Sequence, residues 1–210
     1  MTKEEEKILN SGELYGPRDF EANQASLIEK VNQYNRTPSS AEGRKKREAM
    51  LQDMLGHCGK EIYIEPPFHS NWGGKHVYIG DYFYSNFNLT LVDDGNIVIG
   101  DYVRFGPNVT LVTATHPISP SLRKYKVEYN KQITIGNNVW IGANSVILPG
   151  VKIGNNSIIG AGSLVTKDIP DNVVAFGSPA KVYREITDED FEFYDHGKKI
   201  KQERIEKYGF

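Results

Sequence analysis

A six-residue hydrophobic period runs through the second half of the chain. Isoleucine or valine stands at positions 135, 141, 147, 153, 159 and 165. This spacing matches neither the 3.6-residue repeat of a helix nor the alternation of a strand, so it predicts a repeated architecture and not a single element. The β-branched residues suit short strands, and the Gly and Asn residues that follow them suit corners, because both tolerate a positive φ.

The positions two residues before each aliphatic residue belong to the same pattern. In an extended triplet these two positions share one face, so both sets are expected to point inward. The earlier set is Ile133, Val139, Ser145, Val151, Ser157 and Ser163. Three hexapeptides form a coil of eighteen residues, and stacked coils form three parallel sheets. The predicted stacks are Ile135 on Ile153, Ile141 on Ile159 and Ile147 on Val165. A doubly wound domain needs crossover helices of ten or more residues, and residues 77–180 contain no candidate for them.

Two interruptions break the period. Earlier coils carry Ile79, Ser85 and Leu91 in one frame and Ile99, Phe105 and Leu111 in another. The shift between the frames falls in Asp93-Asp94-Gly95-Asn96, a run typical of turns. A second break, at about 113–132, is too long for a corner and predicts a protruding loop. Interruptions of a regular solenoid are the places where we expect function.

The flanking regions predict helices. Residues 1–58 form an expected N-terminal helical subdomain, with one helix over Asp19–Tyr34 and another over Ser40–Leu55 that Ser39 or Ser40 caps. Residues 59–184 form the solenoid. Residues 185–210 predict a C-terminal helix that starts at Thr187. We expect this helix to pack over an open end or face of the coil, because an unpaired edge invites aggregation.

Composition limits the classes of function. A net charge of -2 over 210 residues gives no electrostatic reason to expect a nucleic acid partner. No apolar run approaches a membrane span, and the charged N-terminus lacks a signal-peptide core, so we expect no membrane partner and a cytoplasmic location. Cys58 is the one cysteine, which rules out an intrachain disulfide and argues against a cysteine-based metal site. No metal is expected.

Several motifs together resemble one known family. The hexapeptide run, YSNFNLTLVDDG, TATHP and GSPAKVYREI, with GELY near the N-terminus and EPPF at 65–68, are similar to the galactoside and maltose O-acetyltransferase family of hexapeptide acyltransferases. The resemblance covers nearly the whole chain. It implies a mainly β fold with a left-handed parallel β-helix, a homotrimer with active sites between subunits, and transfer of an acetyl group from acetyl-CoA to a sugar hydroxyl. The handedness comes from the resemblance alone, since physical rules favour right-handed crossovers.

His116 is the first catalytic candidate, because it matches the family's catalytic base. An imidazole can accept a proton from a hydroxyl and pass it to a leaving thiolate. Without the resemblance, His116 would be interpreted as a loop histidine against Pro117. Asn86 matches the family's asparagine that contacts acetyl-CoA and can donate to the oxyanion, although its position also suits a corner residue. A backbone amide near Gly142 or Ala143 is a second candidate for the oxyanion donor.

The resemblance also assigns binding positions. For the acceptor sugar these are Asp19, Asn71, Tyr84 and Asp94. Asp19 also suits a helix cap and Asp94 a turn. For acetyl-CoA they are Asn86, Ala143, Ala161, Thr166, Lys167, Lys181 and Arg184. Lys181 and Arg184 are cations that suit the phosphates of acetyl-CoA. Lys181 stands where the family often has arginine, so a single charged contact would replace a bidentate one.

Alternatives stay open at this stage. Trp140 should point outward from its strand and be covered by a second subunit, the cofactor, the loop or the C-terminal helix. A xenobiotic acetyltransferase shares the coils and a loop histidine, but the N-terminal motifs favour the sugar branch. A zinc-dependent γ-type carbonic anhydrase needs three histidines on adjacent coils. The histidines at 57, 69, 76, 116 and 196 do not fall on matching faces. A non-catalytic scaffold is the third alternative.

Overall fold

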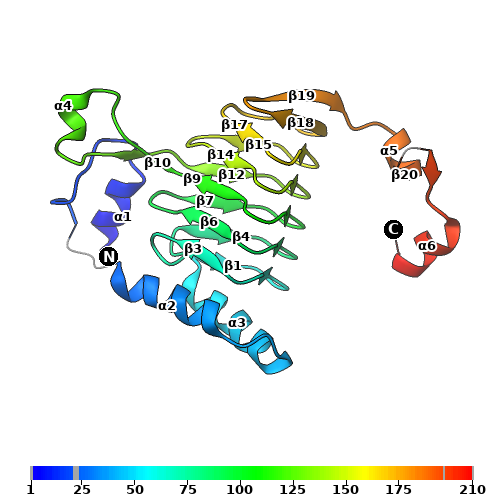
Figure 1. Ribbon diagram of the computed structural model, residues 1–210, viewed down its shortest axis with the longest axis horizontal. Helices are drawn as coiled ribbons and strands as arrows, with labels where there is room; N and C mark the ends of the chain where they lie inside the picture. The colour runs from blue at the N-terminus through cyan, green and yellow to red at the C-terminus, as the bar shows by residue number, and fades with distance from the viewer. Residues whose placement is uncertain (1, 21–23, 196, 210) are drawn as a thin grey trace.

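The computed structural model of the protein describes residues 2–20, 24–195 and 197–209. Its centre is a stack of short parallel strands arranged in three sheets (Figure 1). The first sheet contains β1 (His57–Cys58), β4 (Val77–Ile79), β7 (Ile97–Ile99), β12 (Ile133–Ile135) and β15 (Lys152–Ile153). The second contains β2 (Tyr63–Ile64), β5 (Tyr84–Ser85), β8 (Arg104–Phe105), β13 (Trp140–Ile141), β16 (Ile158–Ile159), β18 (Val173–Gly177) and β19 (Ala180–Glu185). The third contains β3 (Phe68–Ser70), β6 (Leu89–Val92), β9 (Thr110–Val112), β14 (Val146–Ile147) and β17 (Leu164–Val165).

The strand register confirms the six-residue prediction. Ile135 pairs with Ile153, Ile141 with Ile159 and Ile147 with Val165. The earlier frames also stack, with Ile79 on Ile99, Ser85 on Phe105 and Leu91 on Leu111. Both inward sets between 133 and 165 are at most 2% exposed, the three serines included. The fold is therefore a parallel β-solenoid, and its left-handed sense stays a prediction of the family resemblance.

The corners show why Asn and Gly recur. Asn138, Asn156 and Asn172 have φ of 55°, 59° and 58°, a region that Asn enters more readily than most residues. Their amides form a ladder, since Asn138 donates to Asn156 over 3.2 Å and Asn156 donates to Asn172 over 2.8 Å. Glycine is required at position 142 for a different reason, namely lack of space: a Cβ there would lie 2.5 Å from the backbone nitrogen of Ala161. Successive coils thus approach too closely for a side chain at this corner.

The N-terminal region contains three helices, α1 (Lys3–Leu9), α2 (Ala25–Arg36) and α3 (Ala41–Met54). Ser40 caps α3 by accepting the Gly43 N–H, which confirms that prediction. The predicted helix start at Asp19 is wrong. The Asp19 carboxylate accepts the Gly16 N–H over 2.6 Å within a turn, and α2 begins at Ala25. Residues 21–23 lie outside the described residues. Helices α2 and α3 pack against the first coil (Figure 1).

The C-terminal region differs from the single helix that the sequence predicts. It consists of α5 (Glu189–Glu192), the antiparallel pair β20 (Phe193–Asp195) and β21 (Lys198–Lys199), and α6 (Gln202–Tyr208). We call residues 187–209 the C-terminal arm. Thr187 is not the helix cap, because α5 begins at Glu189 after Asp188 and has no side-chain cap bond; the Thr187 N–H donates to the Asp190 carboxylate. The arm leads away from the coils, so the expected packing over them is also wrong (Figure 1). Strand β19 instead covers the edge of β18 by pairing antiparallel with it.

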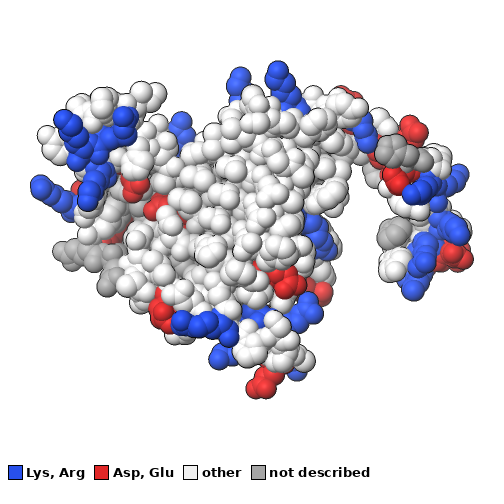
Figure 2. Space-filling model, in the orientation of Figure 1, with Lys and Arg blue, Asp and Glu red and all other residues white. Residues whose placement is uncertain are grey.

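Charged side chains avoid much of the coil surface. In Figure 2 the visible face of the coils is almost free of Lys, Arg, Asp and Glu, while charges gather on the loop, the N-terminal helices and the C-terminal arm. Among the described residues, no helix is both long enough and apolar enough to cross a bilayer. The uncharged face thus belongs to the stacked coils themselves and not to a membrane-spanning helix.

Candidate functional site

The protruding loop rests on a short antiparallel ribbon. The chain leaves the third sheet after β9 and returns at Lys131, whose N–H donates to the Thr113 carbonyl over 2.9 Å. Strand β10 (Ala114–Thr115) pairs with β11 (Tyr129–Asn130), and the short helix α4 (Pro120–Arg123) lies between them in the chain. His116 directly follows β10, so the ribbon fixes the backbone that carries it. The loop stands beside α1 in Figure 1.

The His116 ring has a defined tautomer. Its Nδ1 lies 2.9 Å from the Val127 carbonyl oxygen. A carbonyl oxygen only accepts, so Nδ1 carries the proton of the neutral ring and Nε2 is left with a lone pair. The side chain is 55% exposed, and Nε2 lies 3.8 Å from Oε2 of Glu128. This arrangement can take up a proton at Nε2.

The segment after α1 holds the loop in place. Tyr15 and Glu128 exchange both backbone hydrogen bonds, each 2.9 Å long. The Tyr15 hydroxyl donates to the Asn130 side-chain oxygen over 3.0 Å, and the Asn130 amide donates to the Leu9 carbonyl over 2.9 Å. Tyr15, Glu128 and Asn130 are functional-site residues that the sequence patterns did not single out. The β-prone run VEYN opposite TATH was the signal that could have found them.

A cavity of about 220 Å³ lies between this segment and the coil. Its aromatic walls are arranged edge to face, with Phe20 5.2 Å from Tyr15 and 6.4 Å from Trp72 between ring centroids. On the floor, the Asp94 carboxylate accepts from the Asn71 amide over 2.9 Å and from the Trp72 indole over 3.1 Å. The lining residues are Leu9, Tyr15, Gly16, Pro17, Phe20, Gln24, Trp72, Asp94 and Glu128. Asn71 and Asp94, two of the residues predicted to bind the acceptor sugar, are thus hydrogen-bonded to each other. Trp72, which was not predicted, also binds Asp94.

The frame-shift turn that carries Asp94 is fixed by its buried neighbour Asp93. The Asp93 carboxylate accepts from the Ser70 hydroxyl over 2.7 Å and from the backbone N–H groups of Trp72 and Gly74 over 2.8 and 3.0 Å. Burial raises the pKa of Asp93. The Asp93 carbonyl lies 2.6 Å from Nδ1 of His76, which is also buried. The predicted turn is therefore a rigid support.

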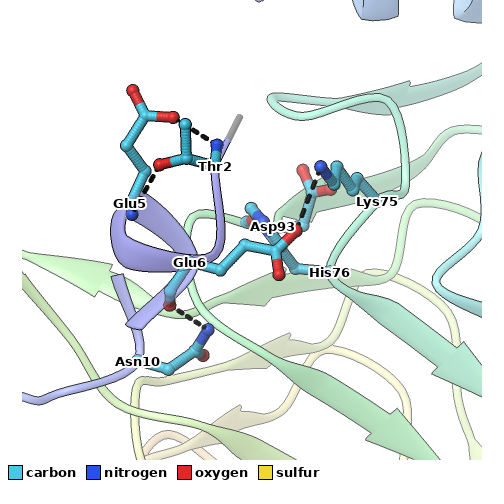
Figure 3. A network of polar contacts seen from close by, with 7 residues as sticks. All are labelled: Thr2, Glu5, Glu6, Asn10, Lys75, His76 and Asp93. Carbon is cyan, nitrogen blue, oxygen red and sulfur yellow. Dashed lines mark hydrogen bonds and ion pairs between the residues drawn. The ribbon is translucent and has the colours of Figure 1, made fainter. Parts of the chain in front are cut away.

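Helix α1 lies beside this support (Figure 3). Its Glu6 pairs with Lys75 over 3.1 Å, and Asn10 at its end accepts the Asn96 N–H over 3.1 Å. Thr2 and Glu5 form a capping box at the other end of the helix. Helix α1 thus connects the frame-shift turn to the loop, since the Leu9 carbonyl binds Asn130.

Acidic groups crowd the inner end of the cavity. Burial, with a smaller contribution from the Asp94 charge, raises the pKa of Glu128. Burial together with the charges of Glu128 and Asp94 raises the pKa of the Tyr15 hydroxyl. Carboxylates accept hydrogen bonds and aromatic walls cover apolar surface. The cavity therefore suits a ligand that combines several hydroxyl donors with an apolar face.

Asp19 lies near the mouth of the cavity without lining it. Gly16 and Pro17 of the same turn do line it, and the Asp19 carboxylate is engaged by the Gly16 N–H. Asp19 therefore caps a turn and not a helix.

One corner of the coil carries three of the residues expected to contact the cofactor. Asn86 follows β5, and Ala143 and Ala161 stand at one position in two successive coils, where the Gly162 N–H donates to the Ala143 carbonyl over 2.8 Å. The Asn86 side-chain oxygen accepts the Phe87 N–H over 2.8 Å, so its amide N–H₂ group points away from that bond. Thr166 and Lys167 follow β17 and are exposed, as is Lys181 on β19.

Tyr84 and Asn86 lie apart from the loop site. Tyr84 stacks on Tyr63 in the second sheet, with 6.5 Å between ring centroids. Across residues 2–20, 24–195 and 197–209, no hydrogen bond or ion pair joins Tyr84 or Asn86 to His116 or Asp94. Two of the six residues predicted for the acceptor and the reaction, Tyr84 and Asn86, thus lie in or directly after β5 of the second sheet and not at the loop site of the same chain.

Arg184 is already paired. Its guanidinium binds both Asp190 oxygens over 2.7 Å, which lowers the pKa of Asp190 to about 2. A hollow of about 400 Å³ lies beside this pair and is lined in part by Trp140, which stays 54% exposed. Asp190 and Phe191 of the C-terminal arm line the same hollow, but the described residues of the arm and the loop leave Trp140 more than half exposed.

Metal ligands do not cluster in the described part of the chain. No group of three or more His, Cys, Asp or Glu residues there is placed to hold a metal ion. His196, one of the five histidines, lies outside the described residues. The carbonic anhydrase alternative thus finds no zinc ligand set among His57, His69, His76 and His116.

Comparisons with known proteins agree with the motifs. Residues 132–167 match the family model "Bacterial transferase hexapeptide (six repeats)". The chain is 52% identical over 199 residues to a galactoside O-acetyltransferase of Lactococcus lactis, covering 92% of this chain and 94% of the relative.

Solved structures give the same result. A galactoside acetyltransferase in complex with coenzyme A is 43% identical, with a TM-score of 0.83 over 96% of this chain and 100% of that one. A maltose O-acetyltransferase from Clostridium difficile 630 is 37% identical, with a TM-score of 0.83 over 90% of this chain and 99% of that one. These matches cover 90% to 96% of the chain and therefore extend beyond the coils. The chain belongs to the galactoside and maltose O-acetyltransferase family.

Proposed function

We propose that the protein is an acetyl-CoA-dependent O-acetyltransferase that acetylates a hydroxyl group of a sugar, with His116 as the general base. The observation that carries the proposal is the His116 ring, whose Nδ1 is held by the Val127 carbonyl while Nε2 stays available. The named activities of the relatives and the coenzyme A complex of one of them support the reaction class.

The reaction proceeds by one proton relay. Nε2 of His116 takes the proton of the acceptor hydroxyl while the hydroxyl oxygen attacks the thioester carbonyl carbon. The tetrahedral oxyanion accepts a hydrogen bond from a donor such as the Asn86 amide. When the carbon–sulfur bond breaks, the acetyl group stays on the acceptor oxygen, and the proton passes from Nε2 to sulfur to give the free thiol. His116 ends the cycle neutral.

The cavity beside the loop is the proposed acceptor site. Asp94 lines the cavity as a hydrogen-bond acceptor and is held by the Asn71 amide, and Asp19 binds the backbone of Gly16, which also lines the cavity. Phe20 and Trp72 suit the C–H face of a sugar ring. This combination supports a galactoside, maltose or a glucose-like sugar as the acceptor. No contact favours an antibiotic over a sugar, so the xenobiotic acceptor is left to the acceptor panel below.

We further propose a homotrimer in which Asn86 and Tyr84 of one subunit complete the site of the next. The separation of these residues from His116 within one chain, the exposed Trp140 and the uncharged coil face support this arrangement (Figure 2). Acetyl-CoA then lies along the corner of Ala143 and Ala161. Thr166, Lys167, Lys181 and Arg184 lie toward its nucleotide end.

A thiol-release assay tests the proposal. Acetyl-CoA is supplied with a panel of mono-, di- and thio-galactosides, maltose and antibiotics, beside His116→Ala. We expect release with sugars and a fall of about 10²- to 10⁴-fold in His116→Ala, the usual contribution of a general base, with unchanged thermal unfolding. Release with antibiotics alone would support the xenobiotic alternative. A scaffold would show no effect of His116→Ala, and absence of release with every sugar by a folded trimer would refute the proposal.

A further inference from the structure

Glu128 lies between the proposed base and the proposed acceptor site. Its Oε2 is 3.8 Å from Nε2 of His116, and its side chain lines the cavity together with Trp72 and Asp94. The preceding residue, Val127, holds the other ring nitrogen through its carbonyl. Two consecutive residues of the returning loop therefore face the two nitrogens of one imidazole.

The backbone of Glu128 is fixed from two sides. Tyr15 pairs with it through two hydrogen bonds of 2.9 Å, and β11 begins at the next residue. The side chain is 28% exposed, against 55% for His116. Its carboxylate is consequently held toward the ring, whereas a free surface glutamate would sample many rotamers.

The charge of the carboxylate favours one state of the ring. With Nε2 unprotonated, its lone pair faces the negative carboxylate, which is unfavourable. Once Nε2 has taken a proton, a positive N–H faces the same carboxylate, and the interaction becomes attractive. The carboxylate thereby strengthens His116 as a base and stabilises the imidazolium between the two proton transfers.

We propose that Glu128 is a positioning residue for His116 that compensates the charge of its imidazolium during acetyl transfer. This inference rests on the proposed function. Glu128 itself stays ionised throughout, and the proton moves only from the acceptor oxygen to Nε2 and then to sulfur. Three groups face the carboxylate: the Tyr15 hydroxyl from the N-terminal segment, Asp94 from the frame-shift turn and His116 from the loop.

Glu128→Gln removes the charge and keeps the shape, and Glu128→Asp keeps the charge. We expect kcat of Glu128→Gln to fall about 10-fold at neutral pH while KM for acetyl-CoA is unchanged. The acid limb of its pH–rate profile should move to lower pH, because a nearby opposite charge favours the protonated ring. Glu128→Asp should recover part of kcat. Glu13→Gln, which removes an exposed charge two residues before Tyr15, the backbone partner of Glu128, is the control and should match the wild type.

Stability separates this role from a structural one. The pKa of Glu128 is raised in the folded state, so its ionisation opposes folding. The wild type therefore loses stability as the pH rises from the ordinary glutamate pKa through the raised one. Glu128→Gln avoids this loss, so its Tm at pH 7 should be equal or about 1–2 °C higher, and the two proteins should converge at about pH 4. A residue needed only for structure would lower Tm.

Two outcomes would overturn the inference. One is an unmoved acid limb in Glu128→Gln, and the other is a fall in kcat that follows a fall in Tm. Either result beside an active wild type and an inactive His116→Ala leaves the proposed function standing. A wild type that releases no thiol with any sugar refutes both.

Discussion

The regular coils and the protruding loop are held by different kinds of interaction. In the coils between residues 133 and 165, each inward residue stacks on its equivalent 18 positions away, and similar contacts recur from coil to coil. In the loop, a few specific bonds reach across the chain, such as Tyr15 to Asn130 over 115 positions and Leu9 to Asn130 over 121. The coils thus form a redundant frame. The loop depends on single contacts, and it carries His116, the proposed base.

The largest expected effect on stability comes from a substitution that forces two stacked coils apart. Gly142→Val places a side chain 2.5 Å or less from the Ala161 backbone nitrogen, which cannot move without separating two coils. We expect a loss on the order of 4 kcal/mol in the free energy of unfolding, measured by urea denaturation.

A second corner glycine is the matched control. Gly162 has φ of 71° with no atom within 4 Å of an added Cβ, so Gly162→Ala should cost only about 1 kcal/mol from backbone strain. Equal losses in the two variants would show that the close approach of the coils is not what Gly142 serves.

A smaller effect is expected where the loop is attached. Asn130→Ala removes the partner of the Tyr15 hydroxyl and of the Leu9 carbonyl, both within the protein interior. Each unpaired group costs about 1–3 kcal/mol. Hydrogen exchange should accelerate in β10, β11 and residues 9–16 and stay unchanged in β13 and β16.

Activity should fall with this local opening, because the His116 ring loses its fixed support. Asn32→Ala, an exposed amide on α2, is the control for loss of an asparagine. Faster exchange spread evenly through the coils would show that the loop and the frame are not separate units.

The smallest effect concerns the C-terminal arm. Asp190 occupies Arg184, one of the cations proposed for the phosphates of acetyl-CoA. Asp190→Asn weakens this exposed pair, so KM for acetyl-CoA should fall about 2- to 4-fold, in the range of a surface ion pair. The difference should shrink in high salt. Glu192→Gln, on the same short helix, should leave KM unchanged, and an unchanged KM in Asp190→Asn would remove Arg184 from the cofactor track.

The features that the sequence predicted correctly were mainly those that depend on residues at a fixed spacing. The stacks from Ile135 to Val165, the buried serines and the Ser40 cap were predictable because each depends on neighbours at a fixed spacing. Asp19 and Thr187 were assigned to helix starts by local rules, but stronger partners engaged them, namely the Gly16 N–H and the Asp190 carboxylate. Glu128 lies in the β-prone run VEYN, but nothing in that run indicates that its side chain faces His116; the pairing with Tyr15 and the return of the loop bring the two together.

The sequence by itself determined the solenoid, because a repeated strand and corner can bury its apolar positions in one way only, by stacking. It also determined where the repeat is broken. Tertiary structure alone decided which tautomer His116 adopts, which carboxylate faces it, and that Tyr84 and Asn86 lie apart from it. The His116 contacts lie within the loop, and the loop is attached by bonds that span 115 and 121 positions. None of these contacts follows the six-residue period, so none leaves a periodic trace in the chain.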